Sequence, residues 1–359
     1  MMKITEILVK EMSFRRRKVF KIAFSASMYA RGVYVKVLTD EGLSGMGEAV
    51  PMPFVTGETI GGVIAAIEHM KPALLGAEVE DIAAVHAIMD GQIAGNTAAK
   101  AAIDMACYDL MGKKLGVPVH RMLGAMVDAV QTDVTVSIDT AEKMAEDAAE
   151  RMRQGFRVLK LKGGISEKDD LANMAAIRAA VGQETELRID FNQGYDMETA
   201  AYMLRRLPEF GITEAEQPVP AWDVESMAKL KPLSPVLLMA DESIHSPRDA
   251  ELVCQKDACH VVNIKLMKCG GIYPALQIAD IAKRYGKPCI LGCMSETKLG
   301  IAAGAAVVAA RADQMGVVDL DSFLNFADTG AGVSGGLTVI GDVIRLSDKP
   351  GFGFDEFEM

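Results

Sequence analysis

The heptapeptide VLKLKGG at residues 158–164 decides how the rest of this chain is interpreted. Lys160 and Lys162 alternate with leucines in an apolar run that is typical of a buried β-strand. Because side chains alternate between the two faces of a strand, both lysines point the same way, roughly 6.6 Å apart. Repulsion between two ammonium groups and burial both lower a lysine pKa, so the pair is predicted to supply a base near neutral pH.

Short apolar strands of the same kind recur from about residue 130, and amphipathic helices fill the gaps between them. Ser246 followed by Pro247 is a typical start of one such helix. This alternation predicts a parallel sheet closed into a barrel, with an active site at the carboxyl ends of its strands. The strands are predicted at 131–137, 156–162, 186–191, 213–216, 236–241, 259–265, 288–293 and 316–321.

The residues before the barrel predict a separate α+β unit, and the residues after it predict a short β-segment. The basic run at residues 15–18, Arg-Arg-Arg-Lys, is interpreted as a solvated turn that joins the first two strands. The predicted elements outside the barrel are strands at 3–12, 33–38, 337–340 and 343–346, and helices at 58–70, 80–92 and 96–115.

Composition excludes several classes of function. A net charge of −11 argues against binding to nucleic acid or to an anionic membrane surface. The longest apolar stretch, residues 299–310, is too short to span a bilayer, and the first residues lack the apolar core of a signal peptide. The six cysteines form no CxxC pair. We therefore expect a cytoplasmic protein with reduced thiols.

Charged residues stand at the carboxyl ends of five successive predicted strands. From Lys162 onward, the members of this set follow one another at intervals of 24 to 28 residues, which is one per barrel unit. Any one of them alone is more simply explained as a charged strand end, but five at this spacing indicate a site. The set consists of Lys160 with Lys162, Asp190, Glu216, Asp241 and Lys265.

Three carboxylates on adjacent strands offer an all-oxygen ligand set, which suits Mg²⁺. The lysines would flank this ion, with Lys162 on one side and Lys265 on the other. A metal that binds a substrate carboxylate can stabilise the enolate formed when the α-proton leaves. Two bases on opposite faces could then remove and return that proton with inversion of the carbon.

The combined motifs resemble the enolase superfamily, in particular its muconate-lactonizing-enzyme subgroup, whose members use a Lys or His base with Mg²⁺. The resemblance implies an α/β fold with a modified TIM barrel of the (β/α)7β type. It also implies an α+β N-terminal capping domain that the C-terminal segment completes. We expect these parts at 1–125 (capping domain), 126–325 (barrel) and 326–359 (returning segment). The motifs are Lys160-x-Lys162, Asp190-x-Asn192, Glu216-Gln217-Pro218, Asp241-Glu242-Ser243 and Asn263-x-Lys265.

The resemblance also implies a role for each residue of the motifs. Lys162 and Lys265 would be the acid/base catalysts, and Lys160 would stabilise negative charge on the substrate. Lys268 is given a structural role on the following loop. One Mg²⁺ per subunit would be bound by Asp190, Glu216 and Asp241, and these ligands and bases would be oriented by Asn192, Glu242 and Asn263.

A further motif, Asp319-x-Asp321, resembles one found in dipeptide epimerases of the L-Ala-D/L-Glu epimerase type. There it would hold the ammonium group of the substrate, whereas solvated loop acids are the simpler alternative. The segment 294–300 resembles the seventh-strand loop of these enzymes, so we expect Met294 and Glu296 to contact substrate. The expected partner is therefore a dipeptide, with no nucleic acid or membrane, and we expect a homo-oligomer.

The capping loop bears on the choice of dipeptide. Members selective for glutamate at the C-terminal position carry an arginine where this chain has Ser25. Ser25 and the apolar residues Phe24 and Phe54 are expected to contact the substrate, with Met28 and Met52 nearby. This difference favours a dipeptide with an apolar second residue. Arg31 could substitute for the missing arginine, which would restore a preference for glutamate.

Other functions remain open at this stage. Within the subgroup they are L-Ala-D/L-Glu epimerase proper, muconate cycloisomerase, o-succinylbenzoate synthase and N-acylamino acid racemase. A metal-free Schiff-base aldolase using Lys162 or Lys265 would leave the three carboxylates without a role. An inactive metal-binding barrel would be indicated by loss of a ligand or base, and all of these residues are present.

Overall fold

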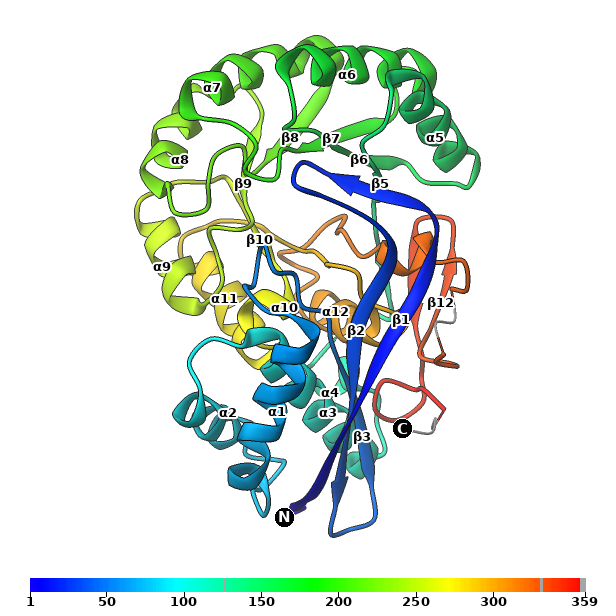
Figure 1. Cartoon of the computed structure of the whole chain (residues 1–359), viewed down its shortest axis with the longest axis vertical. Coiled ribbons are helices and arrows are strands. Elements are labelled where there is room, and N and C mark those ends of the chain that lie inside the picture. Colours follow the sequence, from blue (N-terminus) through cyan, green and yellow to red (C-terminus); the bar gives the residue numbers. More distant parts are fainter. Residues whose placement is uncertain (126, 330–331, 356–359) are drawn as a thin grey trace.

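A curled parallel sheet forms the centre of the molecule, which we describe from a computed structural model covering residues 1–125, 127–329 and 332–355. Its strands lie in chain order, as a repeated βα unit requires. Helices surround the sheet on its outer side (Figure 1). The strands are β5 (Val134–Val136), β6 (Val158–Lys162), β7 (Glu186–Asp190), β8 (Ile212–Glu216), β9 (Leu237–Ala240), β10 (Val261–Ile264) and β11 (Cys289–Leu291).

The predicted eighth strand at 316–321 is reduced to two residues. Val318 forms a parallel bridge with Thr132, just before β5, and Asp319 forms one with Gly292, just after β11. These two bridges connect the edges of the sheet and confirm the predicted barrel. The prediction of a full strand at 316–321 was wrong. Residues 316–317 and 320–321 lie outside the ladder, so this stretch closes the barrel and then supplies loop residues to its mouth.

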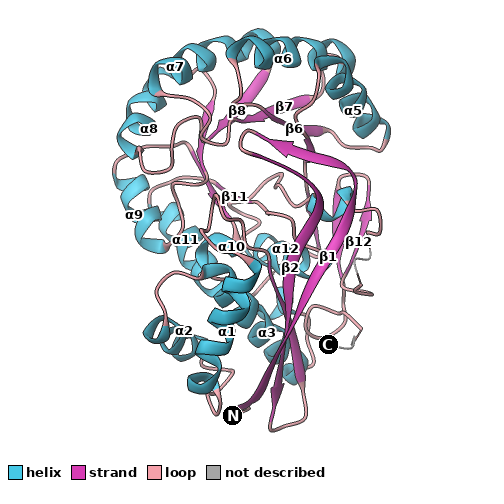
Figure 2. Ribbon diagram, in the orientation of Figure 1, coloured by secondary structure: helices cyan, strands magenta, loops and turns pink. Residues whose placement is uncertain are grey.

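The outer helices confirm the predicted alternation, and Figure 2 shows them as an arc around the outer side of the strands. At the predicted helix start, the Ser246 side chain accepts a hydrogen bond from the Asp249 backbone, and Pro247 is the first helical residue. The helices are α5 (Ala141–Arg153), α6 (Glu167–Val181), α7 (Met197–Arg206), α8 (Val224–Leu230), α9 (Pro247–Gln255), α10 (Leu266–Cys269), α11 (Ile272–Arg284) and α12 (Lys298–Ala310).

A long antiparallel hairpin runs across the barrel mouth (Figure 1). It consists of β1 (Ile4–Ile22) and β2 (Ser25–Thr39), and β3 (Ser44–Ala49) pairs with β2. The predicted turn at the basic run was therefore wrong. Residues 15–18 lie within β1, where the side chains of residues 15 and 17 are exposed and that of Arg16 is buried, the period of two expected for a strand. The hairpin turns only after residue 22.

The tip of this hairpin is attached to the barrel. The Lys21 backbone donates to Ser137 Oγ at 2.9 Å, and the Ile138 backbone donates to the Lys21 carbonyl at 3.0 Å, just beyond β5. Helices α1 (Ile60–Leu74), α2 (Ile82–Gln92), α3 (Thr97–Leu115) and α4 (Val119–Met122) complete this N-terminal region and confirm the predicted α+β composition.

The C-terminal residues contact both the barrel and the N-terminal region. Strands β12 (Leu337–Ile340) and β13 (Val343–Leu346) form a sheet with β4 (Ala129–Gln131). The strand predicted at 131–137 covers β5 and includes only the last residue of β4. Farther along, the Phe352 backbone donates to Asp109 Oδ1 on α3 at 2.8 Å. The boundaries at 125/126 and 325/326 stay a prediction. Of the described helices, none is long and apolar enough to cross a membrane.

The N-terminal sheet packs against α3, a helix that is buried along most of its length. Gly47 on β3 makes this possible, because a Cβ atom there would lie 1.8 Å from the carbonyl oxygen of Ala102 on α3. Close approach of the two elements therefore depends on the absence of a side chain at this position.

We expect Gly47→Ala to lower the free energy of unfolding by about 1–3 kcal/mol, because the added methyl group forces β3 and α3 apart. Gly91→Ala in α2 is the matched control, since no atom lies within 4 Å of its added Cβ. It should raise stability by about 0.4–1 kcal/mol. Urea unfolding of both variants checks the order, and equal midpoints would contradict this account of the packing.

Candidate active site

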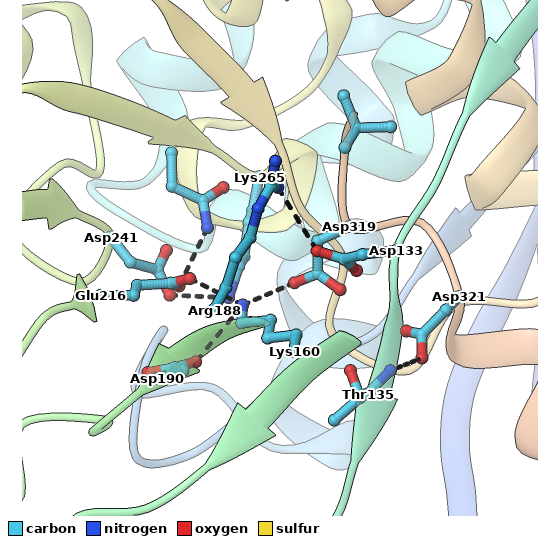
Figure 3. A network of polar contacts seen from close by, with 12 residues as sticks. Asp133, Thr135, Lys160, Arg188, Asp190, Glu216, Asp241, Lys265, Asp319 and Asp321 are labelled. Atoms are coloured by element: carbon cyan, nitrogen blue, oxygen red, sulfur yellow. Dashed lines mark hydrogen bonds and ion pairs between the residues drawn. The ribbon is translucent and has the colours of Figure 1, made fainter. Parts of the chain in front are cut away.

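Three acidic residues end adjacent strands at the same level of the barrel. In the ladder Lys162 on β6 is paired with Asp190 on β7, and Asp190 is paired with Glu216 on β8. Asp241 directly follows β9. All three acidic residues are almost completely buried, and Figure 3 shows their carboxylates converging with Lys160 between them and Asp319.

Lys160 is the central cation of this group. Its Nζ lies 2.7 Å from Glu216 Oε2, 2.7 Å from Asp319 Oδ2 and 3.4 Å from Asp190 Oδ2. Burial acts to lower the pKa of Lys160, but these carboxylates outweigh it and raise the pKa well above its usual range. Lys160 is therefore a buried ammonium that compensates acidic neighbours.

The other two lysines lie on opposite sides of the acidic residues. Lys162 Nζ contacts Asp190 Oδ2 at 2.6 Å, and Lys265 Nζ contacts Asp241 Oδ2 at 2.7 Å. Since β7, β8 and β9 separate β6 from β10, the order across the sheet is lysine, three acids, lysine. The structure thus brings together the constellation that the strand ends predicted.

The predicted fall in lysine pKa was wrong for Lys160, and Lys265 behaves in the same way. Burial lowers the pKa of Lys265, but Asp241 and Glu216 outweigh burial and raise it. The pKa values of Asp190 and Asp241 shift in the opposite sense, whereas burial and the neighbouring Asp190 raise that of Glu216. Burial acts to raise the pKa of Asp241, and Lys265 with Lys268 holds it well below its usual range. Attraction to carboxylates therefore exceeds the lysine–lysine repulsion on which the prediction rested.

The donor set fits a hard divalent cation. Besides the three carboxylates, the buried oxygens without a hydrogen-bond partner among the described residues include three beside this cluster: Asn192 Oδ1, Glu242 Oε2 and Asn263 Oδ1. Each belongs to a residue that contacts the cluster. Asn192 Nδ2 donates to Asp190 Oδ2 at 3.1 Å and to Glu242 Oε1 at 3.2 Å, and Asn263 Nδ2 donates to Glu216 Oε1 at 3.0 Å. An oxygen-rich, buried cluster of this kind is typical of a Mg²⁺ site.

A cavity of about 590 Å³ lies between this cluster and the hairpin. Lys162 and Lys265 line it from the barrel, as do Asp319 and Asp321. Asp321 Oδ2 accepts a hydrogen bond from the Thr135 backbone at 2.7 Å (Figure 3). Burial, and then the neighbouring Asp319, raise the pKa of Asp321 to about 6. The Asp-x-Asp motif is therefore a buried acidic pair and not a solvated loop.

The predicted specificity residues are divided between the cavity and its surroundings. Ser25, Phe24, Met52 and Met294 line the cavity. Phe54 is mostly exposed, and its ring lies 5.4 Å from that of Phe24. The described residues that line the cavity do not include Phe54, and they do not include the predicted positions Met28 and Glu296 either. Glu296 is buried, and it accepts a hydrogen bond from the Met294 backbone at 2.5 Å.

Two functional neighbours were missed from the sequence. Lys268, expected on a loop, lies in α10, is fully buried and contacts Asp241 Oδ1 at 2.5 Å and the carbonyl oxygen of Asn263 at 3.1 Å. Arg16, expected in a solvated turn, lines the cavity instead. The position of Lys268, three residues after Lys265, was a signal in the sequence that it could lie beside the acidic residues. For Arg16, the only signal was its place in the two-residue alternation of a strand, between two exposed neighbours.

We expect Lys268→Met to destabilise the metal-free protein by about 3–5 kcal/mol, because it leaves the buried Asp241 carboxylate with one cationic partner fewer. The control is Lys283→Met, which removes an ion pair with Asp313 in which both side chains are exposed. That change should leave the free energy of unfolding close to that of the parent, because exposed ion pairs contribute little to stability. Urea unfolding measures both, and equal losses would show that burial of the Lys268 pair has no energetic consequence.

Comparison with known proteins agrees with this geometry. A family model described as enolase C-terminal domain-like matches residues 143–356, and the mandelate racemase/muconate lactonizing enzyme N-terminal domain matches residues 4–124. An L-Ala-D/L-Glu epimerase of Clostridium acetobutylicum is 38% identical, with 98% of each chain covered. A hydrophobic dipeptide epimerase of Enterococcus faecalis is also 38% identical, over 98% of this chain and 99% of that protein.

A solved structure is equally similar. The dipeptide epimerase from Enterococcus faecalis V583, complexed with Mg and the dipeptide L-Leu-L-Tyr, superimposes with a TM-score of 0.95 at 37% identity. The match covers 99% of this chain and all of that one. Both halves of the chain match the family models, and full-length relatives share more than a third of its residues. The chain therefore belongs to the mandelate racemase/muconate lactonizing enzyme family of the enolase superfamily.

Proposed function

We propose that this protein is a Mg²⁺-dependent dipeptide epimerase that inverts the α-carbon of the C-terminal residue. The observation that carries the proposal is the placement of Lys162 and Lys265 in one cavity, on opposite sides of three buried carboxylates. The similarity to enzymes named as dipeptide epimerases, one of them in complex with Mg and a dipeptide, supports it.

In this proposal, Asp190, Glu216 and Asp241 hold one Mg²⁺ ion per subunit. When bound, the ion would hold the substrate carboxylate and stabilise negative charge as the α-proton leaves. Hydrogen bonds from Asn192 to Asp190 and from Asn263 to Glu216 keep the ligand oxygens in place. Glu242 orients Asn192 in turn.

Lys162 and Lys265 divide the proton transfer between two faces of the substrate. One lysine, as the neutral amine, takes the α-proton, and the other, as the ammonium, delivers a proton to the opposite face. The two lysines exchange protonation states when the reaction runs in reverse. Lys160 lies below the cavity among Asp190, Glu216 and Asp319, where its charge makes negative charge on the substrate less costly.

Asp319 and Asp321 favour a substrate with an ammonium group. Both line the cavity, and one oxygen from each lies within 4.8 Å of the other and of Cys293 Sγ. A buried acidic pair attracts the N-terminal ammonium of a dipeptide. It would repel the anionic substrates of cycloisomerases and of succinylbenzoate synthases, which lack that ammonium, so the acidic pair argues against the lyase functions.

The side chain of the second residue would lie beneath the hairpin tip. Phe24 and Met52 line this part of the cavity, and Ser25 offers a hydroxyl where an arginine would be needed to pair with glutamate. Apolar surface buried there contributes about 25 cal/mol per Å². We therefore propose an apolar second residue. Arg31 also lines the cavity, but its guanidinium pairs with Glu11.

The function is tested with a set of L,L-dipeptides incubated in D₂O with Mg²⁺, following epimerisation by chromatography and mass gain at the second α-carbon. The parent should epimerise and exchange together. Lys162→Ala and Lys265→Ala should each lose epimerisation, and each should exchange the α-proton of only one epimer, because the opposite lysine remains.

Removal of divalent metal by chelation should abolish both readouts, and added Mg²⁺ should restore them. Lys168→Ala, on the exposed surface of α6, serves as the control and should behave as the parent. Epimerisation at the parent rate by either active-site variant would exclude the two-base mechanism. Full activity in metal-free protein would exclude a role for the metal ion in the reaction.

Substrate preference is tested by comparing kcat/KM for L-Ala-L-Leu and L-Ala-L-Glu. The parent should favour the leucine dipeptide by about ten- to a hundredfold, from roughly 1.5–3 kcal/mol of apolar burial. Ser25→Arg should shift the ratio toward glutamate, because the guanidinium offers a bidentate partner to the carboxylate. A parent preference for L-Ala-L-Glu would overturn the apolar pocket and leave the epimerase assignment standing.

A further inference from the structure

Arg16 is a buried cation in the wall of the substrate cavity. Only 6% of its surface is exposed, whereas residues 15 and 17 on either side are exposed. Its Nη1 donates to the Tyr29 carbonyl at 2.6 Å, and its Nη2 donates to Ser295 Oγ at 2.7 Å. The guanidinium carbon lies 5.5 Å from the centre of the Phe20 ring. These contacts hold the guanidinium at one place beside the cavity.

This cation has no acidic partner among the described residues. The nearby Arg31 pairs with Glu11, but the acceptors of Arg16 are two carbonyl oxygens and one hydroxyl. A guanidinium has five N–H donors, so donors remain for a ligand. Burial lowers the pKa of Arg16 to about 10, which still leaves it charged at neutral pH. A buried charge without a counter-ion is costly unless a ligand supplies one.

Arg16 lies on the same wall as the acidic pair. Ser295, which accepts from Arg16, is followed by Glu296, whose carbonyl oxygen accepts from Ser322 Oγ at 2.8 Å. Ser322 in turn directly follows Asp321, and Ser295, Ser322 and Asp321 all line the cavity. By contrast, Ser25 and Phe24 lie at the hairpin tip, beyond the stretch of β1 that carries Arg16. Arg16 is therefore connected through Ser295 and Ser322 to the side of the cavity that carries Asp321, which would hold the substrate ammonium.

From this geometry we propose that Arg16 is a specificity-determining residue that binds a carboxylate in the side chain of the first residue of the dipeptide. The inference rests on the proposed function and narrows its substrate class to dipeptides with an acidic first residue and an apolar second one. The ammonium of such a substrate pairs with Asp319 and Asp321, and its side-chain carboxylate pairs with the guanidinium. Without Arg16, the acidic pair would repel that carboxylate.

The test uses isosteric substrates, so that only charge differs. For the parent enzyme with Mg²⁺, kcat/KM for L-Glu-L-Leu should exceed that for L-Gln-L-Leu by about ten- to a hundredfold, the range of a hydrogen-bonded charge pair. A second pair of substrates, L-Ala-L-Glu and L-Ala-L-Gln, tests the same carboxylate at the second residue. If the enzyme prefers glutamate over glutamine at the second residue and shows no such preference at the first, the proposed placement of the carboxylate is overturned.

Substitutions at Arg16 then test whether this residue causes the preference for L-Glu-L-Leu. Arg16→Gln should bring the L-Glu-L-Leu to L-Gln-L-Leu ratio close to one, and Arg16→Lys should keep it above one because the charge remains. Arg15→Gln removes an exposed neighbouring guanidinium and should retain the parent ratio. A purely structural brace would lower both rates together and leave the ratio unchanged.

The parent comparison decides the proposal even if Arg16→Gln fails to fold. If the parent converts L-Gln-L-Leu as efficiently as L-Glu-L-Leu, Arg16 is only a brace between the hairpin and the barrel, and the epimerase function stands. If the parent epimerises none of these dipeptides or L-Ala-L-Leu, the proposed function itself fails. The two failures are therefore distinguishable in one set of measurements.

Discussion

Compensation of buried charge is the constraint on which the centre of this molecule depends. Asp190, Glu216 and Asp241 lie with almost no exposure at the ends of adjacent strands, and carboxylates in such a position must be paired. Lysines on the neighbouring strands and on α10 supply that pairing. The same lysines lower the pKa of Asp190 and Asp241 and so favour the ionised state, in which a carboxylate binds a metal ion.

The parallel ladder makes this compensation regular. Each βα unit returns the chain to the same end of the barrel, so successive strand ends bring their charged residues to one level. The order of lysine, three acids and lysine follows directly from chain order in the sheet. Two lysines then face one cavity from opposite sides, and this is the arrangement that inversion at a carbon atom requires.

The hairpin of β1 and β2 provides the other wall of the cavity. Because its two strands continue to residues 22 and 25, it reaches over the barrel mouth and is joined to the end of β5 through Lys21. The barrel thus carries the lysines that we propose as acid/base groups, and the hairpin carries residues such as Arg16 and Phe24 that line another part of the cavity. The proposed function therefore places chemistry and selectivity on separate elements, which would allow one to change without the other.

Local patterns in the sequence determined the βα alternation, the strand-end residues and the start of α9, because these depend on periodicity, spacing and capping within a few residues. The reduction of residues 316–321 to two bridges, and the continuation of β1 through its basic run, depended on partners far away in the chain. The lysine pKa values and the burial of Lys268 and Arg16 were likewise decided only in the tertiary structure. A side chain's charge state and exposure are set by the neighbours that surround it, and those neighbours come from other elements.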